Sequence, residues 1–185
     1  MDHAWRSLQK GLSLIESLVT LGIVAATMQL AVPAMGDLLQ NAALNGASQD
    51  LLMDLHLARS EALKRNRRVA ICKSFDGVRC TTSGGWEQGW IVFHDEDNSG
   101  TLDAGEEVIA HHEALKPVFS VRGNSPVAHY VSYSPIGITR FTSGGFQAGT
   151  ITVCRRSEGS TDAREVIVNP MGRPRVQKAT VTSCA

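Results

Sequence analysis

The sequence carries no net charge, because 18 Lys and Arg residues balance 18 Asp and Glu residues. Such a chain generates no overall field that attracts nucleic acid or anionic lipid, so any such binding must come from a local patch. Enzyme signatures are also missing. There is no Gly-x-Ser-x-Gly, phosphate-binding loop or dinucleotide fingerprint, and the six His residues form no nucleophile or zinc pattern. We therefore expect no catalytic site, no metal site and no cofactor.

A single long hydrophobic run stands near the amino terminus. From Leu12 to Met35 the only charged residue is Glu16, and the run is long enough to span a bilayer as a helix. The eleven residues before it carry Arg6 and Lys10, a positive flank expected to stay in the cytoplasm. A secretory signal would place its small cleavage residue after the run, whereas Gly11 precedes it. Cleavage at Gly11 would therefore leave the hydrophobic helix on the mature protein.

Glu16 is unusual in this setting, since a carboxylate inside a membrane helix is costly unless it has a partner. Two interpretations remain open. Glu16 lies near enough to the interface to stay hydrated, or it pairs with a cation on another chain and sets the register during assembly.

The segment from Leu38 to Asn66 predicts an amphipathic helix that continues the hydrophobic one. Pro33 would kink the combined helix rather than end it, because proline removes one backbone hydrogen bond and crowds the preceding turn. Apolar residues recur at steps of three and four, which places them on one helical face: Leu44, Ala47, Leu51, Leu55, Ala58 and Ala62.

Beyond Arg67 the pattern changes to short β-rich runs separated by Gly, Asp, Asn and Pro turn signals. A helix followed by antiparallel sheets is an α+β arrangement. The predicted strands are Arg68–Lys73, Gly89–His94, Glu107–His112, Val118–Arg122, Ala128–Ser134, Thr150–Arg155, Arg164–Asn169 and Arg175–Thr182.

The four cysteines all lie in this β-rich part, at Cys72, Cys80, Cys154 and Cys184. In an oxidising compartment an even number favours two disulfides, for which three connectivities exist. We favour Cys72–Cys80, which flanks the Asp76-Gly77 turn, and Cys154–Cys184, which ties the carboxyl terminus to a strand.

An acidic segment has the spacing of a helix–loop–helix calcium loop, with alternate oxygen ligands, a central glycine and a carboxylate at the twelfth place. Its flanks, Trp90–Phe93 and Val108–Ala110, are predicted strands, so we favour the acidic turn of a β-hairpin over a calcium site. The residues concerned are Asp95, Asp97, Ser99, Gly100, Thr101, Asp103 and Glu106.

Near the carboxyl end, Arg173 and Arg175 flank Pro174. In an extended segment both arginines point to one side, where two guanidiniums can straddle adjacent phosphates. Because Pro174 cannot donate to a central ladder, the segment is expected at a sheet edge or in a loop. Lys178, and Arg155 or Arg156 if the fold brings them near, would widen the patch. The alternative is that both arginines only cap a turn or pair with Asp162 or Glu165.

The stretch Gly11-Leu12-Ser13-Leu14-Ile15-Glu16 resembles the prepilin peptidase site of type IV pilins and type II secretion pseudopilins. The resemblance implies cleavage between Gly11 and Leu12, N-methylation of Leu12, and pairing of Glu16 with the terminal amine of a neighbouring subunit. Pro33 falls where the family has its helix-kinking proline. Leu12 departs from the pattern, since phenylalanine is usual there.

Further motifs are similar to the FimT/FimU–GspH group of minor pilins and pseudopilins. Among them is Gly172-Arg173-Pro174-Arg175, which resembles the Gly-Arg-x-Arg motif of FimT-type pilins that bind DNA during natural transformation. The likeness implies Arg173, Arg175 and Lys178 as DNA contacts. Contact with phosphates gives affinity with little sequence preference, which suits the uptake of arbitrary DNA.

The resemblance thus predicts a type IV pilin-like α+β fold with four parts: a leader at 1–11, a transmembrane and assembly helix at 12–35, an amphipathic half at 36–66 and a globular head at 67–185. It implies a single pass through the inner membrane, a periplasmic head and a place in the pilus fibre. The implied partners are other pilins, the prepilin peptidase and double-stranded DNA. The alternative function is fibre assembly or initiation, in a pilus or a type II secretion system, without DNA binding.

Overall fold

The computed structural model describes residues 13–184, apart from the side chains of residues 30–34 and 37 in a helix. The chain divides into two compact units, Met1–Asn41 and Ala42–Ala185, and each is described by itself. The expected processing residues Gly11 and Leu12, and the side chain of Pro33, lie outside the described part.

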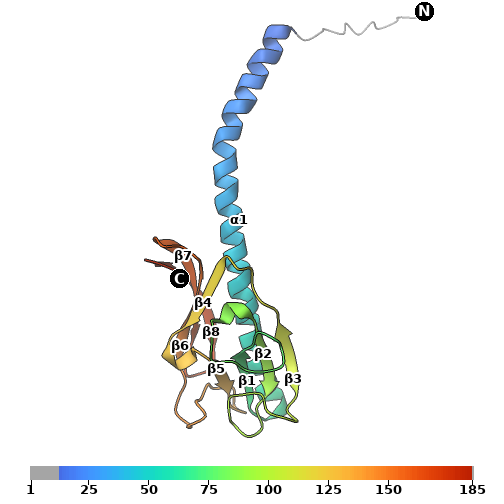
Figure 1. The fold of residues 1–185 in the computed structure, drawn as a ribbon, viewed down its shortest axis with the longest axis vertical. Coiled ribbons are helices and arrows are strands. Elements are labelled where there is room, and N and C mark those ends of the chain that lie inside the picture. Colours follow the sequence, from blue (N-terminus) through green and yellow to red (C-terminus); the bar gives the residue numbers. More distant parts are fainter. Residues whose placement is uncertain (1–12, 185) are drawn as a thin grey trace, which may run out of the picture. The chain divides into compact units, whose positions relative to one another are not determined.

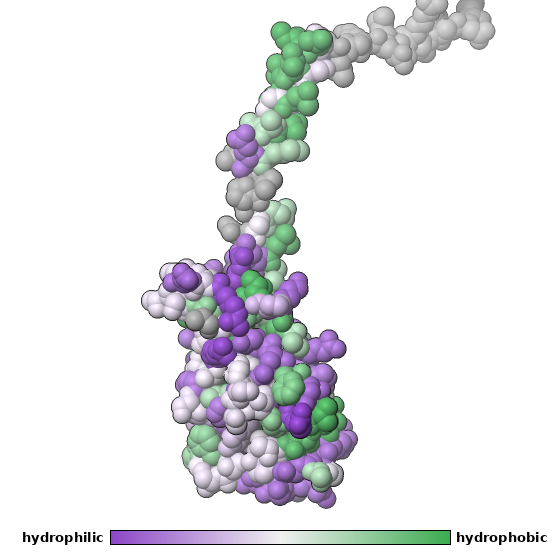
Figure 2. Space-filling view, viewed as in Figure 1, coloured by the Kyte–Doolittle hydropathy of each residue, from purple (hydrophilic) through white to green (hydrophobic). Residues whose placement is uncertain are grey.

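Helix α1, Leu14–Arg65, passes through the whole described portion of the first unit and continues into the second. The helix continues past Pro33, which agrees with the prediction that this proline does not end it. Glu16 is exposed in its first turn. Large apolar side chains such as Leu14, Ile15 and Leu18 are more than half exposed, and Figure 2 shows this apolar surface along the described start of the helix. Among the described residues, no helix offers an apolar stretch long enough to cross a membrane.

Within the second unit, α1 buries the predicted apolar stripe. The side chains of Leu44, Ala47, Leu51, Leu55, Ala58 and Ala62 are each at most 5% exposed. The amphipathic interpretation of this segment is therefore confirmed. The helix ends at Arg65, after which Asn66 adopts the left-handed conformation (φ 51°) and Arg67 donates its backbone N–H to the Ala62 carbonyl.

Two four-stranded antiparallel sheets follow α1, in the orders β3-β2-β1-β5 and β4-β6-β7-β8 (Figure 1). All eight predicted strands are found, with ends shifted by a few residues at most. The first sheet consists of β1 Val69–Lys73, β2 Trp90–His94, β3 Val108–His112 and β5 Tyr130–Tyr133. The second consists of β4 Phe119–Gly123, β6 Gly149–Arg155, β7 Thr161–Val168 and β8 Pro174–Val181.

One hydrophobic core joins the buried stripe of α1 to residues of both sheets, so the α+β prediction is confirmed. Both tryptophans in this core have a hydrogen-bond partner, as buried indole N–H groups usually do. Trp90 Nε1 donates to Asp54 Oδ2 of α1 at 2.8 Å, and Trp86 Nε1 donates to the Val127 carbonyl at 3.1 Å. Trp86 belongs to the short 3₁₀ helix η1, Trp86–Gln88, and Val127 to a second one, η2, Ser125–Val127.

The two disulfides favoured from the sequence are both present, Cys72–Cys80 and Cys154–Cys184. The acidic segment joins β2 to β3, which are antiparallel neighbours, so the hairpin interpretation of its fold is also confirmed. A hairpin turn can still hold a ligand, and this loop is considered again below.

Candidate nucleic-acid interface

The arginine motif lies at the start of β8, which is an edge strand of its sheet, as Pro174 predicted. In the pairing of β7 with β8, Pro174 stands opposite Val168. It is buried there, whereas Arg173 and Arg175 on either side of it are exposed. Pro174, which has no backbone N–H to donate, therefore stands as the first residue of an edge strand.

A tight turn before β8 fixes the position of Arg173. The Gly172 N–H donates to the Asn169 carbonyl at 2.9 Å, and the Arg173 N–H donates to Asn169 Oδ1 at 3.0 Å. Gly172 has a φ of +70°, and a Cβ there would lie 2.0 Å from the Gly137 carbonyl oxygen. The glycine of the motif is thus required by the backbone and by the close approach of a second turn.

That second turn is held by Thr139. Its hydroxyl donates to the Asn169 carbonyl at 2.9 Å, and its backbone N–H donates to the Pro170 carbonyl at 3.2 Å. From the helix, Arg59 Nε donates to the Gly137 carbonyl at 3.0 Å. The turn that carries Arg173 is therefore connected through these contacts to α1.

Strand alternation separates Lys178 from Arg175. Val176 stands opposite Val166 and packs against the core, which makes its side the inner face of the sheet. Pro174 and Lys178 share that face, because they lie two residues from Val176 in either direction. Arg175 lies on the outer face. Lys178 therefore lies on the opposite face from Arg175, and Arg173 lies between the turn and the start of the strand.

On the outer face, Arg175 donates from a terminal guanidinium nitrogen to Gln177 Oε1 at 3.0 Å. Gln177 Nε2 in turn donates to Glu165 Oε2 at 2.8 Å, so Glu165 reaches Arg175 only through the amide. Neither Arg173 nor Arg175 forms a salt bridge with a described residue. Both guanidiniums keep donors available for an anionic partner.

The fold does not bring Arg155 or Arg156 near the patch, which was the condition for their widening it. Arg175 stands opposite Ile167, which pairs with Thr150 at the start of β6, whereas Arg155 ends that strand. Five residues of strand separate them by about 17 Å. Arg156 is also engaged elsewhere, since it pairs with Glu87 at 3.0 Å.

The Glu87 carboxylate explains this position of Arg156. It also lies 3.4 Å from Arg122, and its second oxygen accepts the Val121 N–H at 2.9 Å. Glu87 belongs to η1 and Val121 to β4, so these arginines join a loop between β1 and β2 to the second sheet.

Comparison with known proteins gives the context of this geometry. Residues 47–172 match the family model described as type II transport protein GspH. The chain is also 30% identical, over 177 residues, to the pilin-like protein PilA1 of Thermus thermophilus, and the match covers 91% of this chain and 99% of that protein. The chain belongs to the GspH family.

Crystal structures of the type IV minor pilin FimU from Pseudomonas aeruginosa share the fold. One gives a TM-score of 0.56 at 19% identity, covering 79% of this chain and 98% of FimU. A second crystal form gives 0.54 at 20% identity, covering 77% and 100%. These structures show the pilin-like α+β fold expected from the sequence. The GspH family model and the 30% identity to a pilin-like protein place the chain among the minor pilins and pseudopilins.

Membership of this family implies association with other pilins or pseudopilins, and its members are structural proteins rather than enzymes. Two residues important for the interface were not singled out from the sequence, Gly137 and Thr139. The Pro and Gly turn signals around them indicated a loop, but not that it packs against the arginine turn.

Proposed function

We propose that this minor pilin binds DNA without sequence preference through Arg173 and Arg175, and that this binding serves DNA uptake in natural transformation. The observation that carries the proposal is the pair of exposed arginines at the start of an edge strand, without a salt bridge to a described residue. The resemblance of Gly172-Arg173-Pro174-Arg175 to the motif of DNA-binding pilins supports it.

Physical chemistry favours phosphate as the group that this patch recognises. Guanidinium forms forked, charge-assisted hydrogen bonds with phosphate oxygens. Arg173 just precedes β8 and Arg175 is its second residue, so the two side chains present two separate anchoring points. The chain as a whole carries no net charge, so attraction to DNA must come from a local patch such as this one.

The proposal includes the route by which the head reaches DNA. The prepilin peptidase cleaves after Gly11, Leu12 becomes the N-methylated terminus, and Glu16 pairs with the terminal amine of a neighbouring subunit. The hydrophobic run holds the subunit in the inner membrane, with its head in the periplasm, before it enters the pilus fibre. Support comes from the leader sequence, from the exposed position of Glu16 in the first turn of α1 and from the family.

A salt series of DNA binding tests the proposal. We would measure binding of double-stranded DNA by the full-length chain in detergent, comparing the wild type with Arg173→Gln/Arg175→Gln. Loss of two phosphate contacts should reduce the slope of log K against log salt by about 1.8. Lys178→Gln is the matched control, because it removes a positive charge from the inner face of the same strand and should change the slope less.

Two results would overturn the DNA role. One is an oxidised, folded wild type that does not bind DNA at low salt. The other is a double-arginine variant whose affinity and slope equal those of the wild type. In cells, the same double variant should lose transformation while still forming pili.

The second candidate is an assembly subunit of a pilus or of a type II secretion system that binds no DNA. The match to a family described as a type II transport protein favours it. In that case deletion of the gene should abolish fibre formation or secretion, and the purified chain should not retain DNA.

A further inference from the structure

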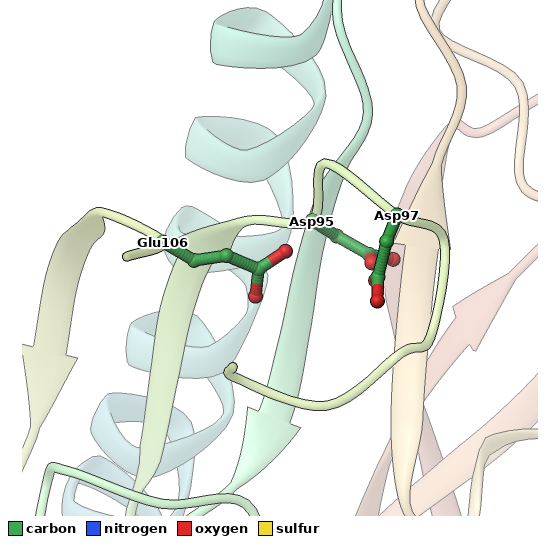
Figure 3. A group of neighbouring side chains, drawn as sticks. All are labelled: Asp95, Asp97 and Glu106. Carbon is green, nitrogen blue, oxygen red and sulfur yellow. The ribbon is translucent and has the colours of Figure 1, made fainter. Parts of the chain in front are cut away.

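The turn between β2 and β3 gathers carboxylates in one place. Asp95, Asp97 and Glu106 each offer a carboxylate oxygen, and these three oxygens lie within 4.8 Å of one another. Figure 3 shows the Asp95 and Asp97 carboxylates pointing toward each other across the loop, with the Glu106 carboxylate directed toward the same side. Acidic groups often gather on a surface without a ligand. Whether this cluster is a binding site therefore depends on the burial and the hydrogen-bond partners of its carboxylate oxygens.

Asp95 supplies the deciding observation. Its side chain is fully buried, at 0% exposure, and its Oδ2 atom has no hydrogen-bond partner among the described residues. The other oxygen accepts a long contact of 3.4 Å from the Gly100 N–H. A buried carboxylate oxygen without a donor destabilises the fold unless something outside the described protein atoms compensates it.

No neighbouring cation in the described part of the chain forms a salt bridge with Asp95. A cavity of about 310 Å³ beside Asp95 is lined by Arg67, Arg68 and Glu96 as well as by Asp95 itself. Arg67 pairs with Glu96 at 2.8 Å, and Arg68 donates to Ser132 Oγ at 3.0 Å.

We propose that the loop Asp95–Glu106 binds one calcium ion, with Asp95, Asp97 and Glu106 as carboxylate ligands. Calcium takes oxygen ligands at 2.3–2.6 Å, so two ligands on opposite sides of the ion are about 4.6–5.2 Å apart. The separation of at most 4.8 Å fits that shell. Magnesium requires a tighter octahedron at 2.0–2.1 Å and should bind more weakly.

The order of residues in the loop agrees with this assignment. Oxygen-bearing side chains occur at the first, third, fifth, seventh, ninth and twelfth places: Asp95, Asp97, Ser99, Thr101, Asp103 and Glu106. Gly100 occupies the sixth place with a φ of +73°, where such loops turn sharply. The loop is carried by two strands here rather than by two helices.

Bound calcium would order more than its own loop. The Leu102 N–H contacts Sγ of Cys80 at 3.3 Å, next to the first disulfide. Asn98 Nδ2 donates to the Thr142 carbonyl at 2.9 Å, in the loop that follows β5. The ion would therefore stabilise three neighbouring loops at one end of the head.

Calorimetric titration tests the site. The full-length chain in detergent is first stripped with a chelator and then titrated with CaCl₂ or MgCl₂, and one calcium ion should bind per chain. In thermal unfolding of the same samples, calcium at 100 times its Kd should raise the Tm by about 5–10 °C. Magnesium should give a smaller shift at equal concentration.

Asp97→Asn is the informative variant, because Asp97 is exposed and the amide keeps an oxygen that can accept the Ser99 N–H. It should fold normally and lose the calcium shift. Asp162→Asn, an exposed acid on β7, is the matched control and should keep it. A wild type without calcium binding at millimolar concentration, or an Asp97→Asn variant with an undiminished shift, would overturn the assignment.

Discussion

The Cys154–Cys184 disulfide ties the end of the chain, just beyond β8, back to β6. Both cysteines are nearly buried and pack against Ala163 of β7, which stands opposite Cys154. The disulfide therefore reaches past the strand that lies between β6 and β8. Replacing both cysteines with alanine should loosen the edge that carries the two arginines.

The expected loss follows from the length of the loops that the disulfides close. For Cys154–Cys184, with a sequence separation of 30, the chain-entropy model gives about 3.6 kcal/mol. For Cys72–Cys80, with a separation of 8, it gives about 2.5 kcal/mol. Cys154→Ala/Cys184→Ala should therefore lower the free energy of unfolding by about 1 kcal/mol more than Cys72→Ala/Cys80→Ala does.

Urea denaturation of the oxidised full-length chain and the two double variants measures this difference. Amide hydrogen exchange should locate the extra opening of the Cys154/Cys184 variant in β8, since fewer constraints then hold that edge. If removing the shorter loop destabilised the chain more, or if β8 kept its wild-type protection, the proposed role of the longer disulfide would be refuted.

Two further predictions concern the second unit. Hydrogen bonds from the Val78 N–H and the Arg79 side chain lower the pKa of Asp76 from its usual 3.8 to about 2. The stability that the charged Asp76 contributes is therefore present above pH 3.8 and is lost as the pH falls toward 2. Acid titration of unfolding should therefore show a smaller loss over that window in Asp76→Ala than in the wild type. Leu55→Ala, at a fully buried position of α1, should lower the free energy of unfolding by about 2–5 kcal/mol. Met53→Ala, at a position 58% exposed, should change it by less than about 0.5 kcal/mol in the same urea experiment.

The helix and the strands were predictable because their signals are local. Leu51, Leu55 and Ala58 repeat with the period of one helical face, and all are buried against the sheets. The strands follow from short β-branched runs between turn signals, and a shift of up to three residues at their ends does not change the fold. Pro174 similarly predicted that its segment lies at a sheet edge, because any proline lacks the N–H that a central strand needs, whatever its surroundings.

Contacts between distant segments were not predictable in this way. The sequence suggested Lys178 and Arg156 as neighbours of the arginine pair only because they lie close to it in the chain or carry the same charge. In the structure, the alternation of side chains along β8 puts Lys178 on the opposite face from Arg175. Arg156 forms a salt bridge with Glu87, which is far away in the sequence. In the same way, the acidic spacing at Asp95 did not reveal that this carboxylate is buried without a donor. Burial of a polar group depends on what the whole fold packs over it.

The arginine motif divides its work between alternate residues. Gly172 and Pro174 are buried, and both fix the backbone. Gly172 adopts a positive φ and allows the close approach of Gly137, and Pro174 has its φ locked by its ring. Arg173 and Arg175 are exposed between and beyond them. Binding phosphate then requires ordering only of two side chains, because the backbone that spaces them is already fixed, and a smaller ordering cost leaves more of the interaction energy as affinity. Positive charge alone at an unfixed terminus would lack that advantage.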